Sequence, residues 1–311
     1  MQKKPVLRVY FFIKSRNFGG KYTEKPEGNM KKGLVMEGGG MRALFSEGFL
    51  DVMLQNGIRV DGIMSVSGSA LFGCNFKSHQ PGRGLRYNIR FKDDPRYMGL
   101  RSFLTTGNFV NAQFAYHTMP LQLDRFDTDT FAADPAEFQV VCTDIVTGQP
   151  VYHRISHVED HTLEWFRATG SMPIASRPVC IDGQLLLDGG LSDCIPLKHF
   201  QDEGYERNIV ILTRPRGYQK QPAKLIPLFR LFHPRHPKVA QLMARRHELY
   251  NSQLRHVEAS AQAGNTLVIY PDHPLDIGRI ELNEDKLRAI YAHGQEKGLA
   301  MLSTVKAFLE A

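Results

Sequence analysis

The pattern that most constrains the fold is a short apolar run, followed by a glycine-rich turn and then by an amphipathic stretch. In GLVMEGGGM, which begins at Gly33, the apolar run leads through three glycines into residues 42–56, where apolar side chains recur at helical spacing. A second unit follows, with a strand at residues 62–66 and a helix at 69–77. Strands that alternate with helices predict an α/β protein with a mainly parallel central sheet, covered by helices on both faces.

Later segments extend this sheet. With 311 residues, 42% of them hydrophobic, the chain is long enough for one large α/β domain. Apolar β signals occur at residues 138–142, 208–213 and 266–270, and residues 178–187 read as paired strands around the turn Asp182-Gly183. Residues 283–309 read as one or two amphipathic helices.

Gly38, Gly39 and Gly40 form the turn of the first unit. Consecutive glycines at a helix N-terminus let backbone N–H groups converge on an anion. This run supports a nucleotide phosphate site and an oxyanion hole equally, because the spacing of Gly38, Gly40 and Ala43 nearly matches GxGxxG, and a plain tight turn also stays open. A dinucleotide site needs an acidic residue after the second strand. Asp61 precedes that strand, which weakens the nucleotide interpretation.

The turn of the second unit is SVSGS, residues 65–69. Ser67, between Val66 and Gly68, matches the serine of the nucleophile elbow GxSxG, but Ser65 and Ser69 replace both flanking glycines. The flanking positions must be small because backbone passes close to them, and serine is nearly as small as alanine. From this stretch alone, Ser67 is either a nucleophile on a strained turn or the N-cap of an ordinary helix.

A third loop, Asp188-Gly189-Gly190, follows the apolar run LLL. A carboxylate that leaves an apolar strand into a two-glycine turn is partly desolvated and can approach other loops, which suits a general base. The alternative is an Asx turn that closes a hairpin. Asp144 and Asp193 are rival acids, and we prefer Asp188.

In this order, the three loops make the sequence resemble the patatin-like phospholipase family, including its bacterial members. The resemblance runs from about residue 33 to residue 212 and rests on Gly38-Gly39-Gly40-Met41-Arg42, on residues 65–70 and on Asp188-Gly189-Gly190. Further matches are Gln80-Pro81-Gly82-Arg83, Cys142-Thr143-Asp144 with Thr147-Gly148, Ser171-Met172-Pro173 and Ile269-Tyr270-Pro271.

The resemblance implies a three-layer α/β/α fold and a serine acyl hydrolase without cofactor or metal. By position, Ser67 would be the nucleophile and Asp188 the proton acceptor of a Ser-Asp dyad, in place of a triad with histidine. Backbone from 38 to 41 would form the oxyanion hole, and Arg42 would steady that loop, unless it is a surface arginine that caps a helix by a salt bridge. The implied substrate is a fatty-acyl ester of a phospholipid or related lipid, cleaved through an acyl-enzyme.

Residues 214–247 form a basic segment with nine Lys and Arg and no acidic residue, which exceeds the net charge of +7 of the whole chain. Its partner should be anionic. The stretch LIPLFRLFHPRHP interleaves leucine and phenylalanine with arginine, which suits docking at an anionic lipid surface. The segment is therefore either a lid or interfacial loop with peripheral contact to an anionic membrane, or a surface excursion packed against the domain.

We expect three regions: a basic N-terminal extension at 1–29, a patatin-like catalytic domain at 30–212, and a region at 213–311 with the basic segment and a C-terminal strand and helix packed on the domain. Residues 1–29 are either a flexible extension or the product of an upstream start codon, since Met30 would itself serve as initiator. The chain lacks an apolar run of the roughly 18 residues that span a membrane, a signal-peptide core and a CxxC pair. These features predict a cytoplasmic protein, with membrane contact only at the inner face.

Two other functions stay open. A patatin fold with weak or no catalysis follows if Ser65 and Ser69 misplace Ser67 by about an ångström. A nucleotide- or nucleic-acid-binding protein would use the glycine loop and the basic segment, although we expect no nucleic-acid partner. Phospholipid, lysophospholipid, neutral acylglycerol and simple thioester or ester substrates all fit the sequence.

Overall fold

The computed structural model describes residues 30–311, so the predicted extension at 1–29 lies outside the described residues. Its central layer is an eight-stranded sheet in the order β5-β6-β3-β2-β1-β7-β8, with β4 also paired to β3. Strands β3, β2, β1, β7 and β8 run parallel, and β4, β5 and β6 join antiparallel. The strands are β1 (Lys31–Met36), β2 (Gly62–Val66), β3 (Glu137–Asp144), β4 (Pro150–Arg154), β5 (Val179–Ile181), β6 (Gln184–Asp188), β7 (Tyr205–Ile211) and β8 (Thr266–Ile269).

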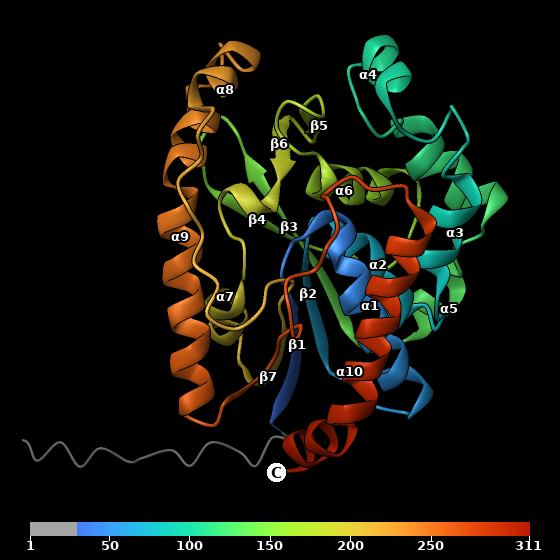
Figure 1. The fold of residues 1–311 in the computed structure, drawn as a ribbon, viewed down its shortest axis with the longest axis vertical. Helices are drawn as coiled ribbons and strands as arrows, with labels where there is room; N and C mark the ends of the chain where they lie inside the picture. Colours follow the sequence, from blue (N-terminus) through green and yellow to red (C-terminus); the bar gives the residue numbers. More distant parts are fainter. Residues whose placement is uncertain (1–29) are drawn as a thin grey trace, which may run out of the picture.

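Helices cover both faces of this sheet (Figure 1). Helices α1, α2, α6 and α10 contribute to the core on one face, and α7 and α9 pack on the other, which gives the predicted three-layer α/β/α arrangement. The helices are α1 (Ala43–Gln55), α2 (Gly68–Lys77), α3 (Arg83–Phe91), α4 (Leu100–Thr106), α5 (Thr128–Ala133), α6 (Asp160–Gly170), α7 (Leu197–Asp202), α8 (Ile226–Phe232), α9 (Pro237–Gln262), α10 (Glu284–Glu310), the short turns η1 (Gly40–Arg42) and η3 (Gly189–Leu191), and the π-helical η2 (Phe114–Leu123).

Two-sided burial explains why the central strands are apolar without interruption. On β1, Leu34 and Met36 pack into the core under α1 and α10, whereas Val35 between them packs into the core under α9. A strand whose alternate residues are buried on opposite faces reads as a continuous apolar run rather than as an alternating one.

Helix α10 is a single helix that crosses α1 at two glycines. A Cβ on Gly48 would come within 2.1 Å of the Tyr291 carbonyl, and one on Gly294 within 2.1 Å of the Phe45 carbonyl. Only glycine permits backbones to approach this closely. The C-terminal helix is thus fixed against the helix that follows the glycine loop.

Some predicted boundaries shift for local reasons. The helix predicted from residue 42 begins at Ala43, because residues 40–42 form a tight 3-10 turn first. The turn between β5 and β6 uses Asp182 and Gly183 with positive φ at both positions, as two-residue hairpins require. Among residues 30–311, the helices are too short or too polar to cross a membrane, and three or more His, Cys, Asp or Glu side chains never gather as they would around a metal ion.

Candidate active site

Strand register brings the second and third loops together. Val66, the last residue of β2, pairs with Val141 of β3, and the next residue of β3, Cys142, pairs with Asp188 of β6. Because β6 runs antiparallel to β3, its last residue, Asp188, lies in the sheet at the same level as the end of β2. Ser67 and Asp188, which lie 121 positions apart in sequence, therefore become neighbours across the strand ends.

Ser67 occupies a strained turn between β2 and α2. Its φ is 57° and its ψ is −133°, in a region that residues with a side chain rarely adopt. The Ser67 hydroxyl makes no capping bond to the helix and instead donates to Asp188 Oδ2 at 2.6 Å. Its amide donates to the hydroxyl of Thr169 at 2.9 Å. The ordinary N-cap, which the sequence left open, is therefore not the conformation of this serine.

Asp188 is held on both carboxylate oxygens. While Oδ2 accepts from Ser67, Oδ1 accepts from the Gly190 amide at 2.7 Å, so the residue also forms the Asx turn that the sequence left as an alternative. Its side chain is only 7% exposed. Burial raises the pKa of Asp188, and the hydrogen bonds from Ser67 and Gly190 together with the charge of Arg246 oppose the rise. A carboxylate with a raised pKa is a stronger base toward the serine hydroxyl.

The serines that replace the elbow glycines have their own contacts. Ser69 is fully buried, and its hydroxyl donates to the Glu37 carbonyl at 2.5 Å, immediately before the glycine loop. Ser65, also buried, donates to the Met36 sulfur at 3.5 Å. Between them, Gly68 has no room for a side chain, because a Cβ there would lie 2.6 Å from the Gly40 carbonyl oxygen. Serine at 65 and 69 thus binds the elbow to β1 and its loop.

The glycine loop lies directly against the elbow. A Cβ on Gly38 would come within 3.1 Å of the Ser67 Cβ, and Gly40 adopts a φ of +57° that favours glycine. Among the described residues, the amides of Gly38 and Gly39 have no hydrogen-bond acceptor, whereas the Met41 amide donates to the Arg279 carbonyl at 3.1 Å. Of the predicted oxyanion donors, Met41 is therefore already engaged, whereas the amides of Gly38 and Gly39 have no acceptor among residues 30–311.

Arg42 is not a surface residue, contrary to one of the two sequence interpretations. It is only 7% exposed, and its Nε is buried without a hydrogen-bond partner among residues 30–311. Burial and the nearby Arg214 lower the pKa of Arg42 to about 10, although Glu37 acts in the opposite direction. The side chain thus carries a charge that the surrounding protein does not fully neutralise.

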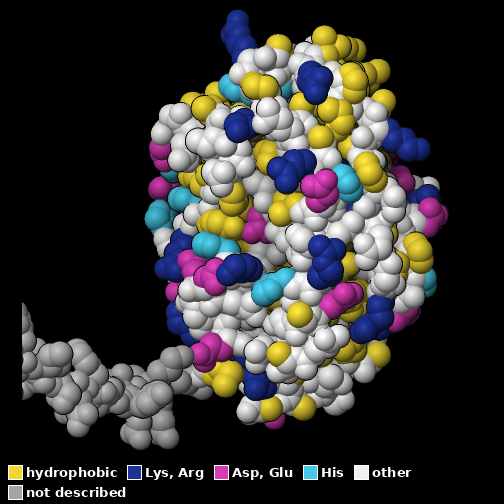
Figure 2. Space-filling model, turned by 90° about the vertical axis from the view of Figure 1, so that its left-hand side faces the viewer, with side chains coloured by type: hydrophobic (Ala, Val, Ile, Leu, Met, Phe, Trp, Pro, Cys, Tyr) yellow, Lys and Arg dark blue, Asp and Glu magenta, His cyan; other side chains and the backbone are white. Residues whose placement is uncertain are grey.

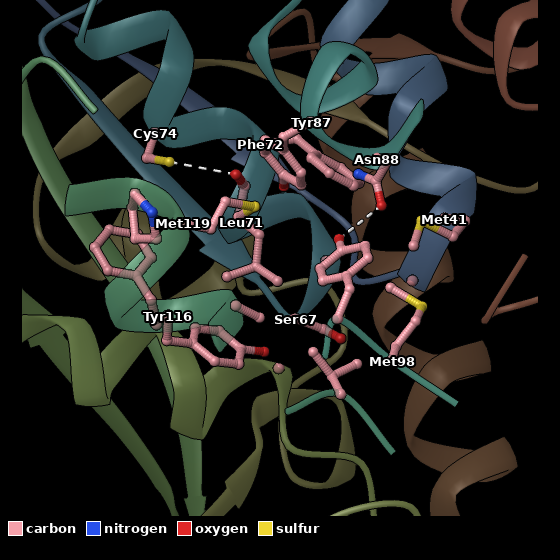
Figure 3. A pocket seen from close by; sticks show the side chains of 18 of the residues that line it. Met41, Ser67, Leu71, Phe72, Cys74, Tyr87, Asn88, Met98, Tyr116 and Met119 are labelled. Atoms are coloured by element: carbon pink, nitrogen blue, oxygen red, sulfur yellow. Dashed lines mark hydrogen bonds between the residues drawn. The ribbon is translucent and has the colours of Figure 1, made fainter. Parts of the chain in front are cut away.

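A narrow apolar cavity opens on one side of Ser67 (Figure 3). Its volume is about 130 Å³, and its walls come mainly from α2, α3, η2 and α6. Figure 3 shows Ser67 among the lining side chains, between Tyr116 and Met98 and below Leu71. The buried Tyr97 hydroxyl donates to Asn88 at 2.8 Å. These two polar side chains therefore satisfy each other, and the cavity lining is otherwise mainly apolar.

A wider and more polar cavity of about 490 Å³ opens on the other side of Ser67. It is lined by the glycine loop and the Asp188 turn, and also by Phe103 of α4 and Phe229 of α8. Basic side chains from the C-terminal third of the chain also line it: Lys220, Arg246 and Arg279. Ser67 thus lies where an apolar and a cationic compartment meet.

The rival acids have structural partners elsewhere. Asp144 caps the turn that follows β3, where its Oδ1 accepts from the Val146 amide at 2.8 Å. Asp193 accepts from Tyr152 at 2.7 Å and from Gln253 at 2.6 Å. Within residues 30–311, none of the histidines lines either cavity at Ser67. The hydroxyl therefore has a carboxylate partner and no imidazole partner.

Several site residues carried no signal in the sequence. Thr169 supports the elbow amide and in turn donates to the Val141 carbonyl at 2.6 Å. Arg246 donates through Nε to the Gly190 carbonyl and so fixes the acid turn. Helical spacing places Arg246 on α9, but only the packing of that helix against the turn reveals its contact.

The basic segment contains α8, whose residues are all at least partly exposed. Phe229 faces the wider cavity, whereas Leu225, Leu231 and Phe232 are exposed large apolar side chains. In Figure 2, hydrophobic side chains gather at the upper end of the molecule with Lys and Arg among them. One face of α8 thus packs and the other faces solvent, and the choice between an interfacial segment and a surface excursion stays a prediction.

Two family models match separate parts of the chain. A model of the patatin-like phospholipase family matches residues 34–200, and a model of a domain of unknown function, DUF6363, matches residues 236–310.

The chain is 25% identical over 283 residues to an uncharacterized protein of Escherichia coli, YjjU, in a match that covers 89% of this chain and 78% of that protein. It is 23% identical to lysophospholipase nte1 of Aspergillus oryzae, where the match covers 85% of this chain and 18% of the relative. The structure of VipD from Legionella pneumophila aligns with a TM-score of 0.43 at 10% identity, covering 88% of this chain and 67% of that one. The chain thus spans less than a fifth of the fungal lysophospholipase.

Proposed function

The chain belongs to the patatin-like phospholipase family, a family of lipid acyl hydrolases, and we propose that it cleaves fatty-acyl esters through a Ser67-Asp188 dyad. The observation that carries this proposal is the 2.6 Å hydrogen bond from the Ser67 hydroxyl to Asp188, made from a strained turn with φ of 57°. Strain of this kind is retained where a side chain must be presented to a substrate. The apolar cavity beside Ser67 supports an acyl chain as the group transferred.

The reaction follows from the direction of that hydrogen bond. Asp188 accepts the hydroxyl proton while Ser67 Oγ bonds to the ester carbonyl carbon, and the proton passes to the alcohol oxygen as the carbon–oxygen bond to the alcohol breaks. Water then attacks the acyl-enzyme with Asp188 again as base, which releases the fatty acid and returns the proton to Ser67. The amides of Gly38 and Gly39 are proposed to hold the oxyanion, a role in which loss of one donor costs about 10²- to 10³-fold.

The test uses Ser67→Ala and Asp188→Asn with a chromogenic short-chain ester. Both substitutions are close in size to the native residues, so circular dichroism should match that of the unmodified protein. We expect turnover to fall by at least about 10³-fold in each, by analogy with removal of a triad member. A fluorophosphonate should label the unmodified protein and not Ser67→Ala. Unchanged turnover in either variant would refute the role assigned to that residue.

Weak catalysis, the rival outcome, is less supported. It rested on the two serines that replace the elbow glycines, and these serines are accommodated by hydrogen bonds to Glu37 and Met36 without displacing Ser67 from Asp188. The nucleic-acid alternative is also less supported, because the patatin-like family match covers the glycine loop, the elbow and the Asp188 turn together.

We also propose that the wider cavity opens toward an anionic membrane. Phe103 of α4 and Phe229 of α8 line this cavity, and the same two helices expose Leu100, Leu104 and Leu231 to solvent. Apolar side chains enter the headgroup region while the neighbouring basic residues meet lipid phosphates. Docking with both helices would bring the cavity mouth to the lipid.

Sedimentation with vesicles tests this contact. Vesicles with about 30% phosphatidylserine should bind the protein more strongly than phosphatidylcholine vesicles, since each basic residue near an anionic surface contributes about 1 kcal/mol. A double variant, Leu104→Ser with Leu231→Ser, should reduce binding, and Leu299→Ser, an exposed leucine on α10, serves as the matched control. Equal binding to both kinds of vesicle would leave α8 as a surface excursion only.

A further inference from the structure

The wider cavity at Ser67 contains more positive charge than the protein neutralises. Arg42, Lys220, Arg246 and Arg279 line it, and the carboxylates among its lining residues are Glu37 and Asp188. The four cations come from η1, from the loop after β7, from α9 and from the β8–α10 connection. Separate segments thus converge on one space with the same sign of charge, which focuses an electrostatic field on an anion.

Within residues 30–311, none of these four cations forms an ion pair with a carboxylate. Arg42 has a buried Nε without a partner, and Lys220 lies 4.5 Å from the centre of the Tyr250 ring. Arg246 donates through Nε to the Gly190 carbonyl, and the charges of Asp188 and Glu37 act on it without a direct ion pair. Burial and the proximity of Arg246 lower the pKa of Lys220 to about 8. Buried cations without partners destabilise the folded state unless an anion joins them.

The two carboxylates already have donors. Glu37 is buried, and its Oε2 accepts from the Thr213 amide at 2.6 Å. Asp188 accepts from Ser67 and from the Gly190 amide. Among residues 30–311, the four cations that line the cavity therefore keep hydrogen-bond donors that these two carboxylates do not occupy.

We infer that this cavity binds the phosphate of the substrate, and that the preferred substrate is a fatty-acyl ester whose alcohol carries a phosphate monoester. This inference rests on the proposed hydrolysis at Ser67, where the acyl chain enters the apolar cavity and the alcohol portion lies on the cationic side. Four cations against two carboxylates leave an excess of two positive charges. A phosphate monoester carries about −1.5 to −2 at pH 7, which matches this excess better than a phosphodiester with one charge. Arginine also binds phosphate oxygens in a bidentate geometry.

Three of the four cations lie outside the patatin-like match, and only Arg42 lies within it. The family model ends at residue 200, whereas Arg246 and Arg279 fall within the match to the domain of unknown function at 236–310, and Lys220 lies between the two matches. The structure thus assigns to the C-terminal region a part in substrate selection, because it contributes three of the cations next to the acid turn.

The test compares three esters with the same acyl chain, each below its critical micelle concentration so that membrane docking plays no part. They are a monoacylglycerol 3-phosphate, a monoacylglycerophosphocholine and a monoacylglycerol. We expect kcat/KM to favour the phosphate monoester over the neutral ester by about 10- to 100-fold, the range expected for hydrogen bonds to charged groups. Lys220→Met and Arg279→Met should each reduce this ratio by about tenfold or more. Lys198→Met removes an exposed charge on α7 and should leave the ratio unchanged.

Two results would overturn the inference while leaving hydrolysis at Ser67 intact. One is a ratio of kcat/KM values near one, between phosphate monoester and neutral ester, in the unmodified protein. The other is a ratio that neither Lys220→Met nor Arg279→Met changes. If none of the three esters is hydrolysed, the proposed function fails instead. In that event, calorimetry on the Ser67→Ala protein still tests the site. Monoacylglycerol 3-phosphate should bind more tightly than glycerol 3-phosphate or inorganic phosphate. Equal affinity for all three would mean that the cavity binds free phosphate and not a lipid headgroup, and this too would overturn the inference.

Discussion

Ser69 offers a direct test of how an elbow without flanking glycines is held. Its hydroxyl is fully buried and donates to the Glu37 carbonyl at 2.5 Å. In Ser69→Ala, that carbonyl loses this donor in a buried environment, which costs about 1–3 kcal/mol of unfolding free energy. In Ser69→Gly, which restores the elbow pattern GxSxG at this position, the same bond is lost and the glycine near the start of α2 costs up to about 1 kcal/mol more.

Urea unfolding followed by circular dichroism measures both losses, and turnover of a short-chain ester reports whether Ser67 stays in place. We expect the order of stability to be unmodified protein, then Ser69→Ala, then Ser69→Gly. We also expect turnover to fall in both variants, because the lost bond joins the elbow to the strand that precedes the glycine loop. If Ser69→Gly were as stable and as active as the unmodified protein, the serine would be a neutral replacement, and our account of the elbow would be wrong.

Three further predictions concern the same site. Gly68→Ala should fold but lose about 10²-fold or more in turnover. The added Cβ would lie 2.6 Å from the Gly40 carbonyl oxygen and would push the elbow away from the glycine loop. A fall of less than about threefold would contradict this contact. Asp188 must be ionised to act as base, and burial raises its pKa. We therefore expect kcat/KM for a neutral ester to fall as the pH is lowered, with a midpoint above the pKa of about 3.9 of a free aspartate. A midpoint at or below that value would argue against Asp188 as the base. Lys220, which faces Arg246, Arg279, Cys194 and Glu37, has a pKa of about 8, so preference for the phosphate monoester should decline above pH 8 and this decline should be absent in Lys220→Met.

The sequence predicted the sheet and its loops because local chemistry specifies them. Strands buried on both faces are continuous apolar runs, and the positions that follow β1, β2 and β6 need residues without bulk. Gly189 illustrates this requirement, since a Cβ there would lie 2.2 Å from the Val141 carbonyl oxygen. The order of strands was not predictable in the same way. Register between β3 and β6 depends on pairing over more than forty residues of sequence, and no local pattern specifies it.

The walls of the cavities were also missed, for a related reason. Helices α3, α4 and η2 are short and amphipathic or irregular, and their side chains acquire a role only by packing around a space. In the same way, the sequence showed that residues 214–247 are basic, but it assigned all of that charge to a surface. Folding divides it, because Lys220 and Arg246 turn inward to the cavity at Ser67 while Arg230 remains on the exposed helix α8.

Arg279 links the oxyanion loop to the cationic cavity, and the two contacts can be separated. Its carbonyl accepts from the Met41 amide at 3.1 Å, and its side chain lines the cavity. A Cβ on Gly40 would lie 2.4 Å from that carbonyl oxygen, at a φ of +57°. Gly40→Ala should therefore displace the loop and lower turnover of every ester by a similar factor, whereas Arg279→Met should act mainly on the ester that carries phosphate. Turnover of matched phosphorylated and neutral esters distinguishes the two. If Gly40→Ala altered only the preference for phosphate, the backbone contact would serve substrate selection and not the geometry of the oxyanion loop.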